Sequence, residues 1–242
     1  MPTYESVNKI IQESSNISLD EDFVGIAVSL DSKGEAFHCG LAVNYNKNIK
    51  LFHFDLGDGD KIKLEDLSKS QSIYFLIKLP IIKSEEVEAF LSKCELILDK
   101  ELDLQFGFFY NGEFFDQNNN LIYKLENHNV TNCVFFCITI ITGFLVGGVY
   151  FNFEDWKEDN FSTNWFENFL LKSSYRKVTK EQLQGLMGIL RRIPPHDYFS
   201  SGEIKALPIT KKAVLEYTEH VRKVFQERFP QKIETKSKEV NS

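Results

Sequence analysis

Three side chains in this sequence have the types needed for nucleophilic catalysis: the thiol of Cys133 and the imidazoles of His38 and His53. Residues 131–148 read TNCVFFCITIITGFLVGG, so a polar Thr-Asn-Cys precedes a long apolar run. A cysteine in the first turn of a helix lies near unpaired backbone N–H groups and the positive end of the helix dipole, and both lower its pKa. Such a thiolate could attack a carbonyl if an imidazole lies within hydrogen-bonding distance.

The two histidines lie in neighbouring segments, AFHCGLAV and IKLFHFDL, which both have the composition of strands. Side chains that face each other on adjacent antiparallel strands approach to about 5 Å, so His38 and His53 could form an imidazole pair. Asp55 shares a strand face with His53 because strand side chains alternate with period two. Asp55 is therefore a substitute for the third group that orients the imidazole.

A structural role is the alternative for each cysteine. A cysteine in an apolar helix is usually a small core residue, and this holds for Cys133 as well. Cys137 lies among Phe and Ile, Cys39 alternates away from His38, and Cys94 belongs to the apolar stripe of a predicted helix. These last three are expected to be core residues.

The other histidines are expected to lie in polar surroundings. His128 lies in a polar loop four residues before Asn132 and could be at the edge of the site. His196 follows two prolines, and His220 lies on a charged helix face, so both are expected at the surface.

The elements that must position these residues form an antiparallel meander followed by helices. Alternation and turn residues predict strands at 23–30, 35–43 and 49–56, joined through DSKG and NYNKN, with GDGDK ending the meander. A further strand is predicted at 72–81, an amphipathic helix at 84–100 with Ser84 as N-cap, and a strand at 102–110. Short helices are predicted within 4–15 and 154–172, and longer ones at 179–193 and 210–229.

The run from Cys133 to Phe151 carries no charged residue and is long enough to suggest a membrane span. Gly143 and the Gly147-Gly148 pair interrupt it, no Lys/Arg cluster flanks it, and acidic residues follow. These features favour a buried helix at about 132–142 that ends at Gly143. No integral membrane span is expected.

Composition limits the remaining classes. The net charge of −7 and the pI near 5.4 argue against nucleic acid as a partner. The four cysteines include no CxxC pair, so neither a zinc site nor a disulfide scaffold is expected, and no cofactor is required. The N-terminal segment lacks the pattern of a Sec signal peptide, so the expected location is the cytoplasm or a compartment reached by a non-Sec route.

The segments HCGLAVNYNKNIKLFHF and TNCVFFCITIITG resemble the motifs of the circularly permuted papain-like cysteine hydrolases. That group includes the lecithin:retinol acyltransferase-like, permuted NlpC-type and PPPDE-like proteins, in which the His-bearing strands precede the Cys helix. The resemblance covers about residues 22–145. It implies that Cys133 is the nucleophile, His38 the general base and His53 the orienting residue, with Asn132 beside the thiol.

The resemblance implies an α+β fold, with an antiparallel sheet packed on the buried Cys-bearing helix. The predicted organisation is an N-terminal helix and loop at 1–21, a permuted papain-like core at 22–153, a helical extension at 154–229 and a disordered tail at 230–242. The expected function is hydrolysis or acyl transfer at an amide, ester or thioester of a protein, peptide or acylated substrate, with a bacterial effector as one setting. The alternative is a non-enzymatic binding protein on a degenerate papain-like scaffold.

Overall fold

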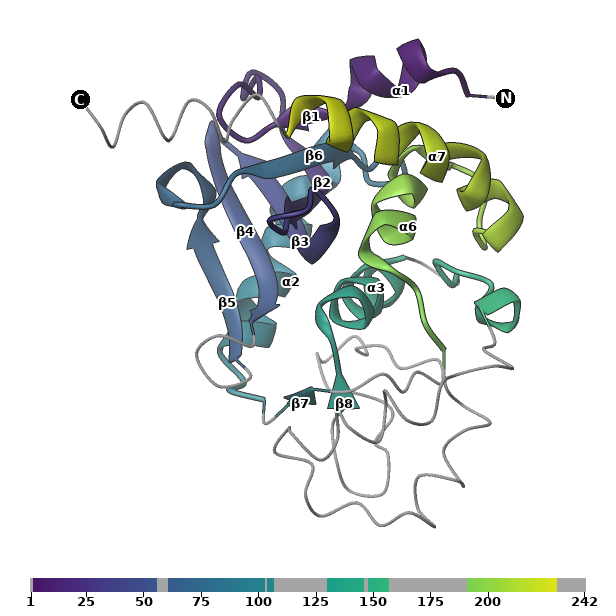
Figure 1. Ribbon diagram of the computed structural model, residues 1–242. Helices are drawn as coiled ribbons and strands as arrows, with labels where there is room; N and C mark the ends of the chain where they lie inside the picture. Colours follow the sequence, from purple (N-terminus) through teal and green to yellow (C-terminus); the bar gives the residue numbers. More distant parts are fainter. Residues whose placement is uncertain are drawn as a thin grey trace, which may run out of the picture.

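An antiparallel sheet of six strands occupies the centre of the computed structural model (Figure 1). The structure describes residues 2–55, 61–102, 104–106, 130–145, 148–156 and 191–229. The strand order is β1-β6-β2-β3-β4-β5, and every neighbouring pair is antiparallel. The strands are β1 (Gln12–Glu13), β2 (Phe23–Leu30), β3 (Ala36–Tyr45), β4 (Asn48–Asp55), β5 (Lys61–Asp66) and β6 (Tyr74–Lys78), and a separate parallel pair consists of β7 (Gln105–Phe106) and β8 (Val130–Thr131).

Five α-helices accompany the sheet in the described part of the chain, so the fold class is α+β as predicted. The α-helices are α1 (Tyr4–Ile10), α2 (Val87–Leu98), α3 (Cys133–Phe144), α6 (Pro195–Ser200) and α7 (Lys211–Arg228). Short 3-10 turns cover Leu67–Lys69, Ser84–Glu86, Phe153–Trp156 and Ser201–Glu203.

The predicted meander is confirmed as β2, β3 and β4. The turn between β3 and β4 is tighter than expected, since Tyr45 pairs with Asn48 and only Asn46 and Lys47 connect the strands. Both turn residues have positive φ, 51° and 61°, which is the geometry of a two-residue hairpin turn that matches the twist of the strands. The meander also continues beyond GDGDK into β5, a strand that the sequence analysis did not predict.

The predicted helices at 84–100 and 210–229 are confirmed as α2 and α7, with local corrections. Ser84 opens a 3-10 turn instead of capping α2. The buried stripe of α2 is Val87, Phe90, Cys94 and Ile97, and it includes Cys94 as predicted. Helix α3 continues through Gly143 to Phe144. Most of the predicted helices at 154–172 and 179–193 lies outside the described residues.

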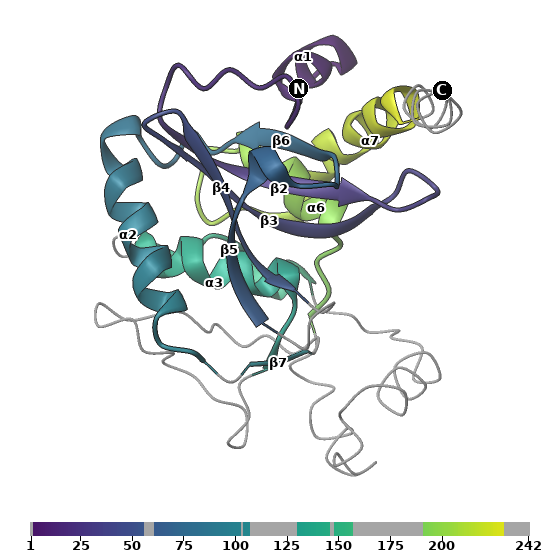
Figure 2. The same cartoon turned by 90° about the vertical axis from the view of Figure 1, so that its left-hand side faces the viewer.

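The helices gather on one face of the sheet (Figure 2). On that face, alternate residues of β2, β3 and β4, such as Val28, Leu41 and Phe52, join one core with the buried sides of α2, α3, α6 and α7. The opposite face has a smaller cluster around Ala42 and Leu51. By strand alternation, His38 and His53 lie on this less covered face.

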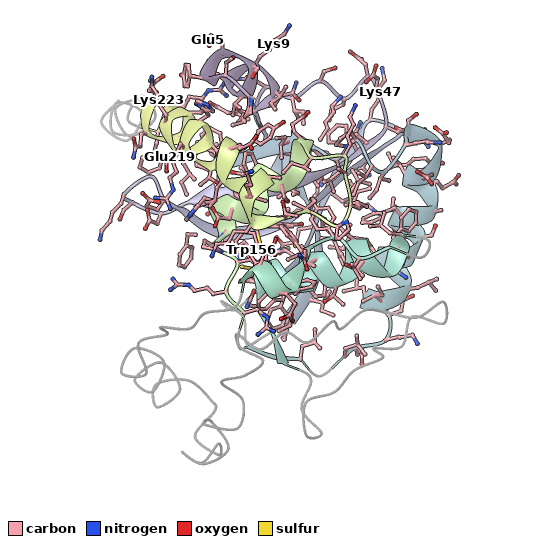
Figure 3. The ribbon with its side chains drawn as sticks, turned by 90° about the vertical axis from the view of Figure 1, so that its right-hand side faces the viewer. Glu5, Lys9, Lys47, Trp156, Glu219 and Lys223 are labelled. Carbon is pink, nitrogen blue, oxygen red and sulfur yellow. The ribbon has the colours of Figure 1, made fainter. Side chains whose placement is uncertain are left out.

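Helix α7 closes the helical layer and packs beside α1 (Figures 1 and 3). Its outer surface carries exposed Glu219 and Lys223, while Val221 and Phe225 are buried. The Arg228 guanidinium donates to the Ile11 carbonyl at 2.9 Å. Buried residues of α7 therefore belong to the same core as the sheet. The division of the chain at residues 22, 154 and 230 stays a prediction.

None of the helices in the described ranges is long and apolar enough to cross a membrane. Helix α3, which covers most of the suspicious apolar run, has 12 residues, and nine of them are buried in the protein.

Candidate active site

Cys133 is the first residue of α3. The preceding residue, Asn132, is the N-cap: it has extended backbone angles, and its side-chain oxygen accepts a hydrogen bond from Phe135 N at 3.0 Å. The Asn132 carbonyl accepts from Phe136 N at 2.8 Å, which starts the helical ladder. Cys133 therefore lies at the N-terminal end of α3, where the helix dipole favours a negative charge.

The Cys133 thiol lies between two consecutive residues of β3. Hydrogen bonds with Cys39 and with His38, together with the charge of His38, lower the pKa of Cys133 well below its usual value, and they outweigh the opposing effect of burial. Burial, followed by the hydrogen bond with Cys133, raises the pKa of Cys39, which therefore stays protonated and donates. Cys133 as a residue is only partly buried, unlike Cys39, Cys94 and Cys137.

Cys39 is a site residue that the sequence analysis assigned only to the core. Its side chain is buried as predicted, on the helix-covered face of the sheet. Helix α3 packs on that same face, however, and this brings the Cys39 thiol to Cys133. Strand alternation places the side chains of Cys39 and His38 on opposite faces of β3. It does not keep Cys39 away from the thiol of Cys133 at the start of α3.

His38 and His53 form the predicted imidazole pair. His38 Nε2 lies 2.8 Å from His53 Nδ1, and the two rings meet edge to face with centroids 5.0 Å apart. His53 is buried, and burial, then the charge of His38, lowers its pKa, so the ring is neutral near pH 7. Since Nε2 of His38 is engaged by His53, Nδ1 is the nitrogen left for the thiol.

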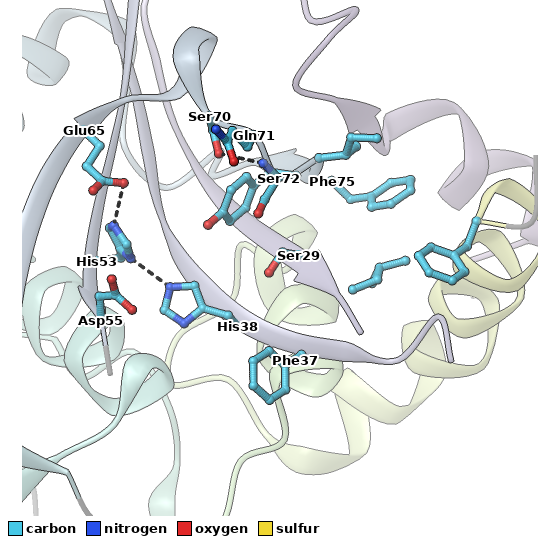
Figure 4. Close-up of a pocket in the computed structure, with 14 residues that line it drawn as sticks. Ser29, Phe37, His38, His53, Asp55, Glu65, Ser70, Gln71, Ser72 and Phe75 are labelled. Atoms are coloured by element: carbon cyan, nitrogen blue, oxygen red, sulfur yellow. Dashed lines mark hydrogen bonds and ion pairs between the residues drawn. The ribbon is translucent and has the colours of Figure 1, made fainter. Parts of the chain in front are cut away.

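Glu65 on β5 is the carboxylate next to the second imidazole (Figure 4). Its Oε2 lies 3.4 Å from His53 Nε2. The proton positions that satisfy every contact place a proton on His38 Nε2, which donates to His53 Nδ1, and another on His53 Nε2, directed at Glu65. The four groups thus form a relay from thiolate to carboxylate.

Asp55, the predicted substitute for the third group, lies near His53 on the same strand, and its carboxylate forms an ion pair with Lys63. Asp55 Oδ2 is 2.6 Å from Lys63 Nζ. The Asp55 charge still raises the pKa of His53, although less than Glu65 does. The sequence did not lead to Glu65 because strand β5 was not predicted. The alternating residues KIKLED after a Gly-Asp turn are the pattern that could have indicated this strand.

Gly40 allows the imidazole pair to form. A Cβ at this position would lie 2.7 Å from Leu51 Cδ1 and 2.9 Å from His53 Cβ. Both distances are well inside van der Waals contact, so only glycine lets β3 approach His53 this closely. The close packing of β3 against β4 therefore explains why glycine follows His38-Cys39 in this motif.

The remaining predicted residues have varied outcomes. Asn132 lies beside the thiol as expected and acts as a helix cap, whereas His128 lies outside the described residues. His196 is not a freely exposed residue: only 13% of its side chain is accessible, and it contacts Asp197 and Arg222. Because its partners Asp197 and Arg222 belong to α6 and α7, His196 is part of the contact between these two helices.

No group of three or more His, Cys, Asp or Glu side chains within the described ranges has an arrangement that could hold a metal ion. Comparisons of the chain with protein-family models, with curated proteins and with solved structures found no match.

Proposed function

We propose that this chain is a cysteine hydrolase or acyltransferase in which Cys133 forms a covalent acyl intermediate. The observation that carries the proposal is the position of His38: its Nε2 lies 2.8 Å from His53 Nδ1, and its charge and hydrogen bonding lower the pKa of the Cys133 thiol. A side chain held in this way can hold a proton next to the thiolate and return it during the reaction. The permuted papain-like resemblance assigns the same roles.

In the proposed reaction, Cys133 Sγ attacks the carbonyl carbon of an amide, ester or thioester. The C–S bond forms as the carbonyl π electrons move to oxygen, and the backbone N–H group of Cys133 stabilises that oxyanion. As the tetrahedral intermediate collapses, His38 gives its proton to the leaving group. An acyl thioester on Cys133 and a neutral His38 result.

The second half of the reaction reverses the proton movement. His38 takes a proton from water or another acceptor, whose oxygen or nitrogen attacks the thioester carbonyl. The C–S bond breaks, the electron pair returns to Cys133 Sγ, and the thiolate–imidazolium pair is restored. Neutral His53 accepts a hydrogen bond from imidazolium His38, and Glu65 fixes the orientation of His53.

Thiol reactivity tests the first requirement of this mechanism. Alkylation by iodoacetamide follows the thiolate fraction, so Cys133 should react at pH values well below the ordinary thiol pKa of about 8.5. In His38→Ala, the pH profile should move towards that ordinary value. His220→Ala, a change to a histidine on α7, is the matched control, and peptide mass spectrometry separates the four cysteines.

Acylation tests the covalent step. Mixing the chain with p-nitrophenyl acetate should release a burst of about one p-nitrophenolate per chain, with the acetyl group on Cys133. A Cys133 that reacts no faster than a free thiol, or whose reactivity ignores His38, would contradict the enzyme and favour a binding protein on the same scaffold.

A further inference from the structure

A cavity of about 640 Å³ opens on the less covered face of the sheet, against the imidazole pair (Figure 4). His38 and His53 form part of its wall, and Ser29 and Tyr74 lie beside them. This volume is within the usual range for small-ligand sites. His38 also lowers the pKa of the Cys133 thiol, so the same imidazole borders both the cavity and the nucleophile.

The position of the cavity indicates which part of a substrate could bind there: the acyl group, or the leaving group and the acceptor that later replaces it. In a cysteine hydrolase the leaving group receives its proton from the imidazole, and the attacking acceptor gives a proton to the same imidazole. Both groups therefore approach the thioester from the His38 side. The cavity borders that side.

The charge of the cavity favours neutral or cationic groups. Two carboxylates, Asp55 and Glu65, lie in its wall, and Lys63 pairs with both, at 2.6 Å and 3.8 Å, so that one positive charge faces two negative charges. Among its described lining residues there is no Lys or Arg. A phosphate-bearing leaving group such as coenzyme A or a phospholipid headgroup would meet this negative charge, and none of the described lining residues is a cation that could pair with the phosphate.

The other end of the cavity is apolar. Leu30, Ile73 and Phe229 line it, and Phe37, directly before His38 on β3, lies at its edge with 70% of its surface exposed. A large exposed aromatic ring beside a cavity often marks a binding surface. An apolar side chain of a bound segment would cover Phe37 and gain burial there.

We infer that this cavity binds the amine side of an amide substrate, as a neutral or basic peptide segment whose first residue has an apolar side chain. The inference rests on the proposed function. In the acceptor direction, the amine nitrogen attacks the acyl thioester and His38 takes the amine proton. The new C–N bond replaces the C–S bond, and the thiolate of Cys133 is released.

Partitioning of the acetyl-enzyme tests the inference. The chain is first acetylated with p-nitrophenyl acetate and the excess reagent, which also acetylates free amines and thiols, is removed. Phenylalanine amide, glycine amide, glutamic acid α-amide or coenzyme A is then added at equal concentrations. The ratio of acetylated acceptor to free acetate is then measured by mass spectrometry. This ratio depends only on the steps after acylation, so it reports the acceptor site separately from the nucleophile.

Phenylalanine amide should be acetylated roughly tenfold more than glycine amide, from burial of one aromatic side chain, and both should exceed the glutamic acid amide and coenzyme A. Phe37→Ala should reduce the preference for phenylalanine amide several-fold, whereas Leu96→Ala, a change to another exposed apolar residue on α2, should not. Gln71→Lys should raise capture of the glutamic acid amide.

Two results would overturn the inference. An acetyl-enzyme that forms but partitions equally among all acceptors, or prefers coenzyme A, contradicts the acceptor site while the proposed function stands. If no acetyl-enzyme forms at all, the proposed function and the inference both fail.

Discussion

Glu65 Oε2 lies 3.4 Å from His53 Nε2, across the ladder between β5 and β4. His53 pairs directly with Lys63 in that ladder, so Glu65, two residues further, is its diagonal neighbour on the same face. Lys63 Nζ lies 2.6 Å from Asp55 Oδ2 and 3.8 Å from Glu65 Oε1, and Glu65 also pairs with His53. Substitutions of the two carboxylates should therefore have different effects.

Glu65→Gln should lower the acylation rate by about tenfold, because the carboxylate that orients His53 and raises its pKa is lost. Asp55→Asn should have a smaller effect, since most of the Asp55 charge acts on Lys63. The measurement is the burst rate with p-nitrophenyl acetate, with thermal unfolding to confirm that both variants fold. Equal losses in the two variants would contradict the assigned relay.

Gly40→Ala should displace His53 and slow alkylation of Cys133, because the new Cβ would lie 2.9 Å from His53 Cβ. Overpacking of this kind also destabilises a protein by roughly 1–3 kcal/mol. Gly202→Ala is the matched control: its Cβ would lie 2.4 Å from Ile77 Cγ2, away from the site. It should lose stability in urea unfolding but keep the wild-type reactivity of Cys133.

Asn132→Ala should lose about 1 kcal/mol of stability by removing the cap of α3. Asn132→Asp retains a cap but places a negative charge beside the thiolate, so it should raise the pKa of Cys133. The pH profile of alkylation separates these effects. Thr210→Ala removes the equivalent cap of α7 and should change stability without moving the profile; a shifted profile there would show that the readout reports general loosening.

His196 should make the fold sensitive to acid. Burial, then the charges of Arg222 and Arg192, lowers its pKa to about 4, so the folded chain resists protonation of a ring that the unfolded chain protonates near pH 6.5. Stability from this residue is present above about pH 6.5 and is lost as the pH falls towards 4. Between about pH 7 and pH 5 the loss should be about 2 kcal/mol.

Urea unfolding of wild type and His196→Gln at both pH values measures this loss. The variant is expected to be less stable at pH 7, because Arg222 loses a partner, but its stability should fall less on acidification. The same decrease in both proteins would assign acid sensitivity to other groups.

Local patterns predicted much of the scaffold. Alternation identified β2, β3 and β4, helical spacing identified α2 and α7, and the polar Asn-Cys before an apolar run located the start of α3. His38 and His53 followed as a pair because a tight antiparallel turn fixes which side chains share a face. These features depend on residues close together in the chain.

The missed features depend on contacts between distant segments. Glu65 lies near His53 only because of the register of β5 on β4. Cys39 lies near Cys133 only because α3 packs on the face of β3 that carries Cys39, opposite to the face that carries His38. Neither contact produces a periodic pattern of residue types in the sequence. The comparison of Asp55 with Glu65 shows why a carboxylate on the same strand face is a weaker guide than the diagonal neighbour on the next strand.

The arrangement of β3 also has a consequence for how folding could be followed. His38 and Cys39 are consecutive, so their side chains leave the strand on opposite faces, and Cys133 needs both. A slip of β3 by one residue would exchange the two faces, leaving the thiol without its base and burying an imidazole among apolar side chains. Recovery of a reactive Cys133 during refolding would thus serve as a chemical reporter of strand alignment, sensitive to an error that leaves the secondary-structure content unchanged.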